Sequence, residues 1–155
     1  MKKLFDGDVY ADYGQFYVYD VEASPDDLPE LTPASAKELC RRGYRQTDSV
    51  ACFVTRAHFH VHWLEVYLAD SVPRFKEAHQ SKLTLPFTLE GDGIIIHGPT
   101  TSESQYGRCN IPAGTYQLYV FGYNLGIEAP PPPSSGKRGK VSHDGEGYRL
   151  VFVPD

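Results

Sequence analysis

Short segments in which large apolar residues recur at every second position constrain the fold of this chain more than any other feature. In segment 13–21, Phe16 and Val18 point to one face and Tyr17 and Tyr19 to the other, which is the period of a β-strand. Eleven tyrosines, eight phenylalanines, fourteen glycines and twelve prolines favour strands joined by tight turns over a helix bundle. The predicted strands are Tyr13–Val21, Val50–Thr55, Phe59–Leu68, Lys82–Leu89, Ile94–His97, Thr115–Phe121 and Tyr148–Val153.

One segment, residues 33–42, carries the end signals of a helix instead. Thr32 is a preferred N-cap residue, Pro33 suits the first turn, and Gly43 suits the position after the last turn. The predicted buried stripe of this helix consists of Ala36, Leu39 and Cys40. Together the elements predict a mainly β protein, an antiparallel β-sandwich of about seven to eight strands with one short α-helix, forming a single domain over residues 1–155.

Two segments rich in glycine or proline are predicted to connect strands. Gly91-Asp92-Gly93 is expected to be the turn of a hairpin that pairs the strand 94–97 with the strand 82–89. The segment at about 128–147 contains four consecutive prolines, a short basic cluster and several glycines. A regular core element cannot form from that composition, so we expect a long mobile loop.

The negative charge of the chain is concentrated at its beginning. The first thirty residues hold eight acids and two lysines, a charge of −6, whereas the other 125 residues hold twelve acids and thirteen bases and give the total of −5. Charge of this sign repels nucleic acid, so direct nucleic-acid binding is not expected, and it attracts a cationic protein surface. The alternative is that these acids form an ordinary solvated edge.

A partner-binding surface is predicted where this acidic segment meets the tyrosines of the first predicted strand. Aromatic residues anchor protein interfaces, and carboxylates at the rim steer the approach of a basic partner. The predicted partner-binding residues are Asp20, Glu22, Asp26, Asp27 and Glu30, with Tyr17 and Tyr19 as anchors. Tyrosines at strand spacing can equally be ordinary sheet residues, or can bind a carbohydrate or peptide on the face of a sandwich.

Three histidines at alternate positions, His58, His60 and His62, suggest a metal-dependent β-barrel enzyme as a rival hypothesis. Residues two apart on a strand share a face, but the outer two lie about 13 Å apart, so at most two could bind one ion. The third ligand would come from Glu65, His79 or His97. The simpler interpretation is a polar outer face opposite Trp63, and we predict no metal and no cofactor.

Further sequence signals argue against an enzyme and for a cytoplasmic protein. The chain has no nucleophile elbow, phosphate-binding loop or dinucleotide fingerprint. Cys40, Cys52 and Cys109 are odd in number and scattered, which favours a reducing compartment over a disulfide framework. No secretory signal and no apolar stretch of transmembrane length are found, so we expect no membrane insertion.

Several short motifs follow one another along about residues 13–121. They are Tyr13-Gly14-Gln15-Phe16-Tyr17-Val18-Tyr19, Leu39 to Tyr44, Asp48 to Phe53, Leu83-Thr84-Leu85-Pro86-Phe87, Gly93-Ile94 and Ile111-Pro112-Ala113-Gly114-Thr115-Tyr116-Gln117-Leu118. In this order and spacing they resemble the ComJ competence proteins, which are inhibitors of a DNA-entry nuclease.

This resemblance implies a non-enzymatic β-rich protein that binds and silences a basic nuclease. It identifies no inhibitory residue, because the matched positions have the character of turn and core residues: Phe16, Gly43, Tyr44, Pro86, Phe87, Gly93, Pro112, Gly114 and Tyr116. The implied function agrees with the charge pattern, since an acidic protein can occupy a DNA-binding cleft as a phosphate mimic.

Overall fold

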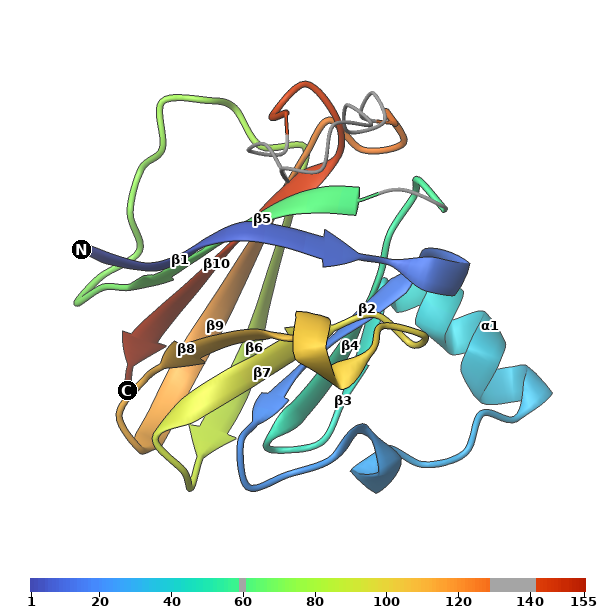
Figure 1. Ribbon diagram of the computed structural model, residues 1–155, viewed down its shortest axis with the longest axis horizontal. Coiled ribbons are helices and arrows are strands. Elements are labelled where there is room, and N and C mark those ends of the chain that lie inside the picture. The colour runs from blue at the N-terminus through green and yellow to red at the C-terminus, as the bar shows by residue number, and fades with distance from the viewer. Residues whose placement is uncertain (59–60, 129–141) are drawn as a thin grey trace.

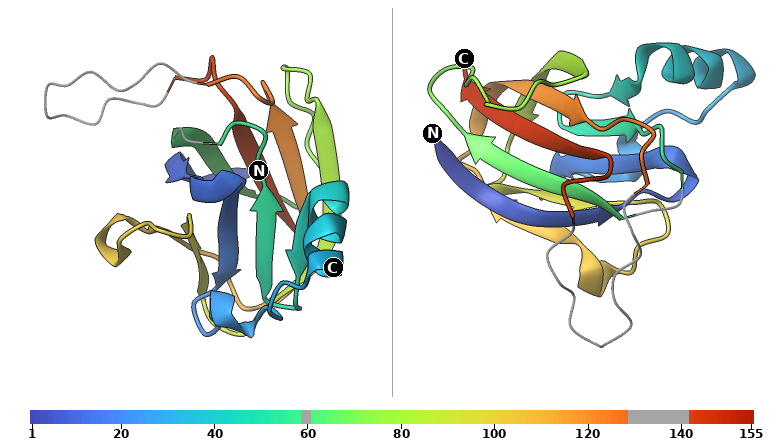
Figure 2. Two further views of the ribbon diagram at one scale, coloured as in Figure 1. Left: turned by 90° about the vertical axis from the view of Figure 1, so that its right-hand side faces the viewer. Right: turned by 90° about the horizontal axis from the view of Figure 1, so that it is seen from above.

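Two five-stranded β-sheets pack face to face in the computed structural model (Figures 1 and 2). The structure describes residues 1–58, 61–128 and 142–155. Sheet A contains, in spatial order, β1 (Lys2–Tyr10), β5 (Val61–Leu68), β10 (Gly147–Pro154), β9 (Gly114–Tyr123) and β6 (Ser81–Leu89). Sheet B contains β3 (Tyr44–Gln46), β4 (Val50–Val54), β2 (Gln15–Asp20), β7 (Gly93–His97) and β8 (Gly107–Asn110).

The predicted mainly β sandwich with one helix is confirmed, with more strands than expected. Ten strands are present in the described residues, because β1, β3 and β8 were not predicted. Each of these three lies at the edge of a sheet, where one long side of the strand has no neighbouring strand. Among the described residues every strand pairing is antiparallel except that of β5 with β10, which is parallel.

The main core lies between the two sheets and follows the alternation seen in the sequence. Phe16 and Val18 on β2 face inward from sheet B, and Leu64 on β5 and Phe152 on β10 face inward from sheet A; all four are fully buried. Burial of a side chain of this size contributes about 1.5–3 kcal/mol. These inward residues occupy the inner face of each sheet, so a binding site would lie on one of the two outer faces.

The helix α1 (Pro33–Arg42) has the predicted bounds and end signals. Gly43 has φ 82°, a left-handed conformation that suits glycine, and its N–H donates to the Leu39 carbonyl. The predicted buried stripe is wrong in part, because Leu39 is buried and Cys40 is exposed. The helix lies beside β3 at one side of the sandwich (Figure 1), so only a narrow stripe of it is covered.

The predicted hairpin between strands 82–89 and 94–97 is wrong, because β6 and β7 belong to different sheets. The chain crosses from sheet A to sheet B at residues 90–92, and β6 pairs with β9 instead. The buried carboxylate of Asp20 accepts hydrogen bonds from the N–H groups of Glu90 and Gly91 and so holds this crossover against the end of β2. Such a long-range contact cannot be seen in a local turn motif.

The predicted facing of β5 is inverted. His62 points into the core with Leu64, whereas Trp63 and Tyr67 lie on the outer face of sheet A. That outer face is also covered, because Phe75 from the connection between β5 and β6 packs against the ring of Tyr67. A strand buried on both faces loses the contrast between apolar and polar positions from which facing is read.

The long loop predicted at about 128–147 falls mostly on residues 129–141, which lie outside the described residues. Residues 142–146 form the approach to β10, and Glu146 within it is buried. None of the helices in the described part of the chain has the length and apolar character needed to cross a membrane.

Candidate protein-binding site

The candidate site lies on the outer face of sheet B, where residues 22–31, the acidic loop, cross the sheet. The loop is anchored by Leu28, which is buried in a cluster with Tyr19, Val50, Cys52 and Ile95. It runs from the end of β2 to the start of α1 and lies below sheet B in Figure 1. Leu28, with the partly buried Ala23 beside the same cluster, therefore holds the acidic loop against the sheet.

Local hydrogen bonds give the acidic loop a defined shape. The short 3-10 helix η2 (Pro25–Asp27) begins at Ser24, whose Oγ accepts from the Asp26 N–H at 3.2 Å. The Asp27 carboxylate accepts in return from the Ser24 N–H at 3.0 Å, which completes a capping box. The side chain of Arg45 on β3 donates to the Pro29 carbonyl. The loop thus presents its carboxylates from a folded backbone.

Four of the five predicted acids are on the surface of this loop. Glu22, Asp26, Asp27 and Glu30 are exposed, and among the described residues none of them forms an ion pair with a lysine, arginine or histidine. The fifth, Asp20, is only 1% exposed and binds the backbone of Glu22, Glu90 and Gly91. Asp20 therefore shapes the loop and is not available to a partner.

Tyr19 is likewise buried, and its hydroxyl forms a hydrogen bond with His97 on β7 in the middle of the outer face of sheet B. The Tyr19 hydroxyl and the His97 Nε2 are 2.9 Å apart, and His97 Nδ1 is 2.7 Å from the Gly98 carbonyl. A carbonyl can only accept, so Nδ1 carries the proton and Nε2 accepts from Tyr19. Burial lowers the pKa of His97 and raises the pKa of Tyr19 to about 12. Both groups are thus neutral near pH 7.

Tyr17 and Tyr106 are the half-buried aromatic residues that reach the surface beside this pair. The Tyr106 ring stacks on His97 with centroids 3.8 Å apart and planes 7° apart, and Tyr17 contacts the same imidazole at 5.6 Å. Tyr17 also packs against the cluster that contains Leu28, which places this ring beside the acidic loop, and burial raises its pKa. The predicted meeting of tyrosine and acid is therefore present, with Tyr17 as its surface member.

Sequence reasoning did not identify His97 and Tyr106 as members of this face. They come from β7 and from the residue between η3 (Glu103–Gln105) and β8, about eighty residues after Tyr17 along the chain. Only the abundance of tyrosine hinted at an extended aromatic surface. The assembled face combines exposed carboxylates with ordered aromatic rings, an arrangement that is complementary to a cationic protein surface.

Two members of the histidine series predicted as a rival metal site, His58 and His62, lie in different environments. His62 lies inside the sandwich with Nε2 3.1 Å from the Glu146 carboxylate, whereas Glu65 is on the opposite face of β5. His58 is exposed, and His60 lies outside the described residues. In the described part of the chain, the side chains close enough together to hold a metal ion are Asp6, Glu65 and His143, on sheet A.

The fold and the face together define a two-sheet β-sandwich with an acidic, tyrosine-bearing outer surface. The chain belongs to the competence protein J (ComJ) family, whose model matches residues 8–143. This confirms the resemblance found over residues 13–121 and extends it at both ends.

Two solved structures are similar to the chain over its whole length. One is the crystal structure of ComJ from Bacillus subtilis, described as an inhibitor of the DNA-degrading activity of NucA; it has 18% identity and a TM-score of 0.66 and covers 99% of this chain and 98% of that one. The other is the product of crocagin biosynthetic gene J, with 10% identity, a TM-score of 0.61 and coverage of 100% and 99%. No curated protein sequence matches. At these identities the two structures establish the shared fold.

Proposed function

We propose that the chain inhibits a DNA-degrading nuclease by stoichiometric binding through the outer face of sheet B. Its membership of the ComJ family carries the proposal, since B. subtilis ComJ is described as an inhibitor of the DNA-degrading activity of NucA. The site contributes the chemistry: Glu22, Asp26, Asp27 and Glu30 on an ordered loop beside the rings of Tyr17 and Tyr106.

The physical basis is mimicry of the nuclease substrate. A protein that holds DNA neutralises phosphates with lysine and arginine side chains, so its cleft attracts anions. Carboxylates on a folded loop can occupy that cleft without the entropic cost of ordering a flexible segment. Long-range attraction by the −6 segment raises the association rate at low salt, and the aromatic rings slow dissociation by excluding water.

This role needs no catalysis by the chain itself, so we propose that it is not an enzyme and needs no cofactor to bind its partner. We also propose that residues 1–155 act as one domain in the cytoplasm. All three cysteines are free thiols in the structure, which suits a reducing compartment.

The test is a titration of DNA cleavage. A basic DNA-degrading nuclease from the source of this chain would be held at a concentration far above the expected dissociation constant, and cleavage of a fluorescent duplex would be followed as the protein is added. We expect activity to fall linearly to a sharp end point at equal molar amounts. Unchanged cleavage at a large molar excess would contradict the proposal.

A further inference from the structure

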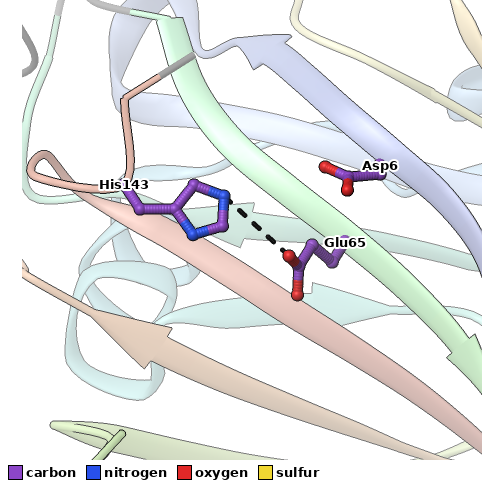
Figure 3. Close-up of side chains that lie close together, drawn as sticks. All are labelled: Asp6, Glu65 and His143. Atoms are coloured by element: carbon purple, nitrogen blue, oxygen red, sulfur yellow. Dashed lines mark ion pairs between the residues drawn. The ribbon is translucent and has the colours of Figure 1, made fainter. Parts of the chain in front are cut away.

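A second group of polar side chains lies on sheet A, far along the sequence from the acidic loop. Asp6 on β1 and Glu65 on β5 are directly opposite each other in the antiparallel pairing of these strands, so their carboxylates are neighbours on one face. His143, from the turn before β10, points its imidazole toward them (Figure 3). Like charges directly opposite on neighbouring strands are destabilising unless a cation lies between them.

The ammonium of Lys3 contacts both carboxylates. Its Nζ is 3.1 Å from Asp6 Oδ2 and 3.1 Å from Glu65 Oε1. The Lys3 side chain is 40% exposed and long, so it can leave this position at little cost. Asp6, Glu65 and His143 therefore surround a position for a cation, and the Lys3 ammonium that lies there now can be exchanged for another cation.

The donor atoms of the three side chains lie slightly farther apart than they would in a site with a bound metal ion. One donor atom from each of Asp6, Glu65 and His143 lies within 4.8 Å of the other two. By the geometry of a triangle, an ion between them is at most roughly 2.8 Å from each atom, so shifts of about 0.7 Å give the 2.0–2.2 Å bonds of zinc to oxygen and nitrogen. Asp6 and His143 are exposed and can make these shifts.

Contacts behind the donor atoms orient two of them. Glu65 Oε2 accepts from the Tyr67 hydroxyl at 2.6 Å and from Arg149 Nε at 2.7 Å, which leaves Oε1 directed at the site. The His143 ring stacks on Trp63 with centroids 4.2 Å apart and planes 12° apart, and its Nε2 faces Glu65 Oε1 at 3.8 Å. Such outer contacts hold ligands in place in metal sites.

We propose that Asp6, Glu65 and His143 bind a divalent transition metal ion of the zinc class, which displaces the ammonium of Lys3. One imidazole nitrogen and two carboxylate oxygens suit Zn²⁺, with water in the fourth position. The ion replaces the single positive charge of Lys3 with two, while the guanidinium of Arg149 stays on Glu65 Oε2. It also ties β1, β5 and the turn before β10 together, a role independent of nuclease binding.

The test is isothermal titration of untagged, metal-free protein with zinc chloride, repeated with H143A, K3M and the control H79A. His79 is an exposed histidine in the connection between β5 and β6 and is not one of the three proposed ligands. We expect one zinc per chain, an affinity more than about tenfold weaker in H143A, and a tighter affinity in K3M because the competitor is gone. H79A should match the wild type.

Cobalt absorption gives a second readout that does not depend on affinity alone. Replacement of zinc by cobalt should give the visible bands of a four-coordinate ion in the wild type and in K3M, and these bands should be lost in H143A. The proposal is overturned if zinc does not bind stoichiometrically, if H143A and H79A weaken binding equally, or if K3M binds no more tightly than the wild type.

Discussion

The two outer faces of the sandwich carry the same kinds of residues, acids and aromatic rings, but use them in opposite ways. On sheet A, Glu65 is buried and bound by Arg149, Lys3 and Tyr67, and the segment with Phe75 covers the face. On sheet B, the acids of the acidic loop are exposed, and the cluster beneath them is anchored by Leu28. The buried carboxylate of sheet A is paired within the molecule, whereas the loop acids over sheet B are exposed to solvent.

This difference shows why a count of acidic residues does not locate an interaction site. Burial alone would raise the pKa of Glu65, but hydrogen bonds from Tyr67, Arg149 and Lys3 outweigh it and hold the pKa at about 2. A carboxylate so paired adds little to the long-range field that steers a protein partner. The loop carboxylates keep their net charge because, among the described residues, none of them pairs with a lysine, arginine or histidine, and salt in the solvent screens the field of that charge.

The largest effect is predicted for a substitution that removes the ion pair between Glu65 and Arg149 on sheet A. Arg149→Ala removes the main partner of Glu65, whose side chain is 4% exposed, and leaves this buried charge with only the half-exposed Lys3 ammonium and the Tyr67 hydroxyl. We expect a loss of about 3–5 kcal/mol in the free energy of unfolding, measured by urea titration. Binding to the nuclease, measured where the variant is folded, should change little.

A double variant controls for the loss of side-chain volume. Glu65→Met with Arg149→Met removes both charges and keeps apolar bulk on the outer face of sheet A, so it should be more stable than Arg149→Ala. If the double variant were the less stable of the two, packing and not charge pairing would be the important contribution of Arg149.

The second prediction concerns how the stabilisation that the charged form of Glu65 provides depends on pH. The folded pKa of Glu65 is about 2, below its ordinary 4.5, so its stabilisation is present above pH 4.5 and is lost as the pH falls toward 2. The difference in unfolding free energy between wild type and Glu65→Gln should shrink by something on the order of 3 kcal/mol over this window. A constant difference between pH 5 and pH 2 would show that Glu65 is not held in its charged form.

The third prediction sharpens the comparison from the exposed side. Asp26→Lys with Glu30→Lys reverses two loop charges and spares Asp27, whose carboxylate caps η2. We expect nuclease affinity to fall by roughly 10- to 100-fold, with a flatter dependence on salt and an unfolding free energy within about 0.5 kcal/mol of the wild type. Surface plasmon resonance at several salt concentrations measures both effects.

A matched reversal separates local charge from net charge. Asp70→Lys with Asp155→Lys makes the same change in net charge at exposed positions of sheet A and its connections. This control should lose much less affinity than the loop variant. Equal losses would mean that the overall charge of the chain, and not the acidic loop, steers the partner.

The smallest predicted effect concerns the neutral pair beneath the tyrosines. Burial lowers the pKa of His97 below its ordinary 6.5, so the folded state binds fewer protons than the unfolded state and stability falls as the pH drops below 6.5. The change should stay under about 1.4 kcal/mol for each pH unit. His97→Gln should show a weaker decline between pH 7 and pH 5.5, and an identical decline would exclude His97 as its source.

The strands that the sequence did not reveal, β1, β3 and β8, lie at sheet edges, and most of their residues are exposed or half-buried. The alternation of Phe16 and Val18 identified β2, and the Pro33 and Gly43 signals identified α1 with its observed bounds. On β5, however, both faces are covered, so His62 and Trp63 were assigned to the wrong sides. The crossover at residues 90–92 depends on Asp20, about seventy residues earlier.

The acidic character of the candidate site could be predicted from the sequence, but only some of its residues could. The exposure of loop acids such as Asp26 could be predicted from the sequence, because the segment holds too few apolar residues to form a core that would cover them. That Asp20 and Tyr19 would turn inward depends on backbone groups and on His97, which the fold brings from other strands. The same applies to Tyr106, whose place beside Tyr17 results from sheet pairing and not from any local pattern.

Hydrogen exchange of the chain with and without its nuclease tests the central claim most directly. The account predicts that binding slows exchange in residues 15–31 and 103–110, the outer face of sheet B and its neighbouring segment, and leaves residues 70–80 over sheet A unchanged. Protection confined to residues 70–80 and to β5, with unchanged exchange in the acidic loop, would contradict it.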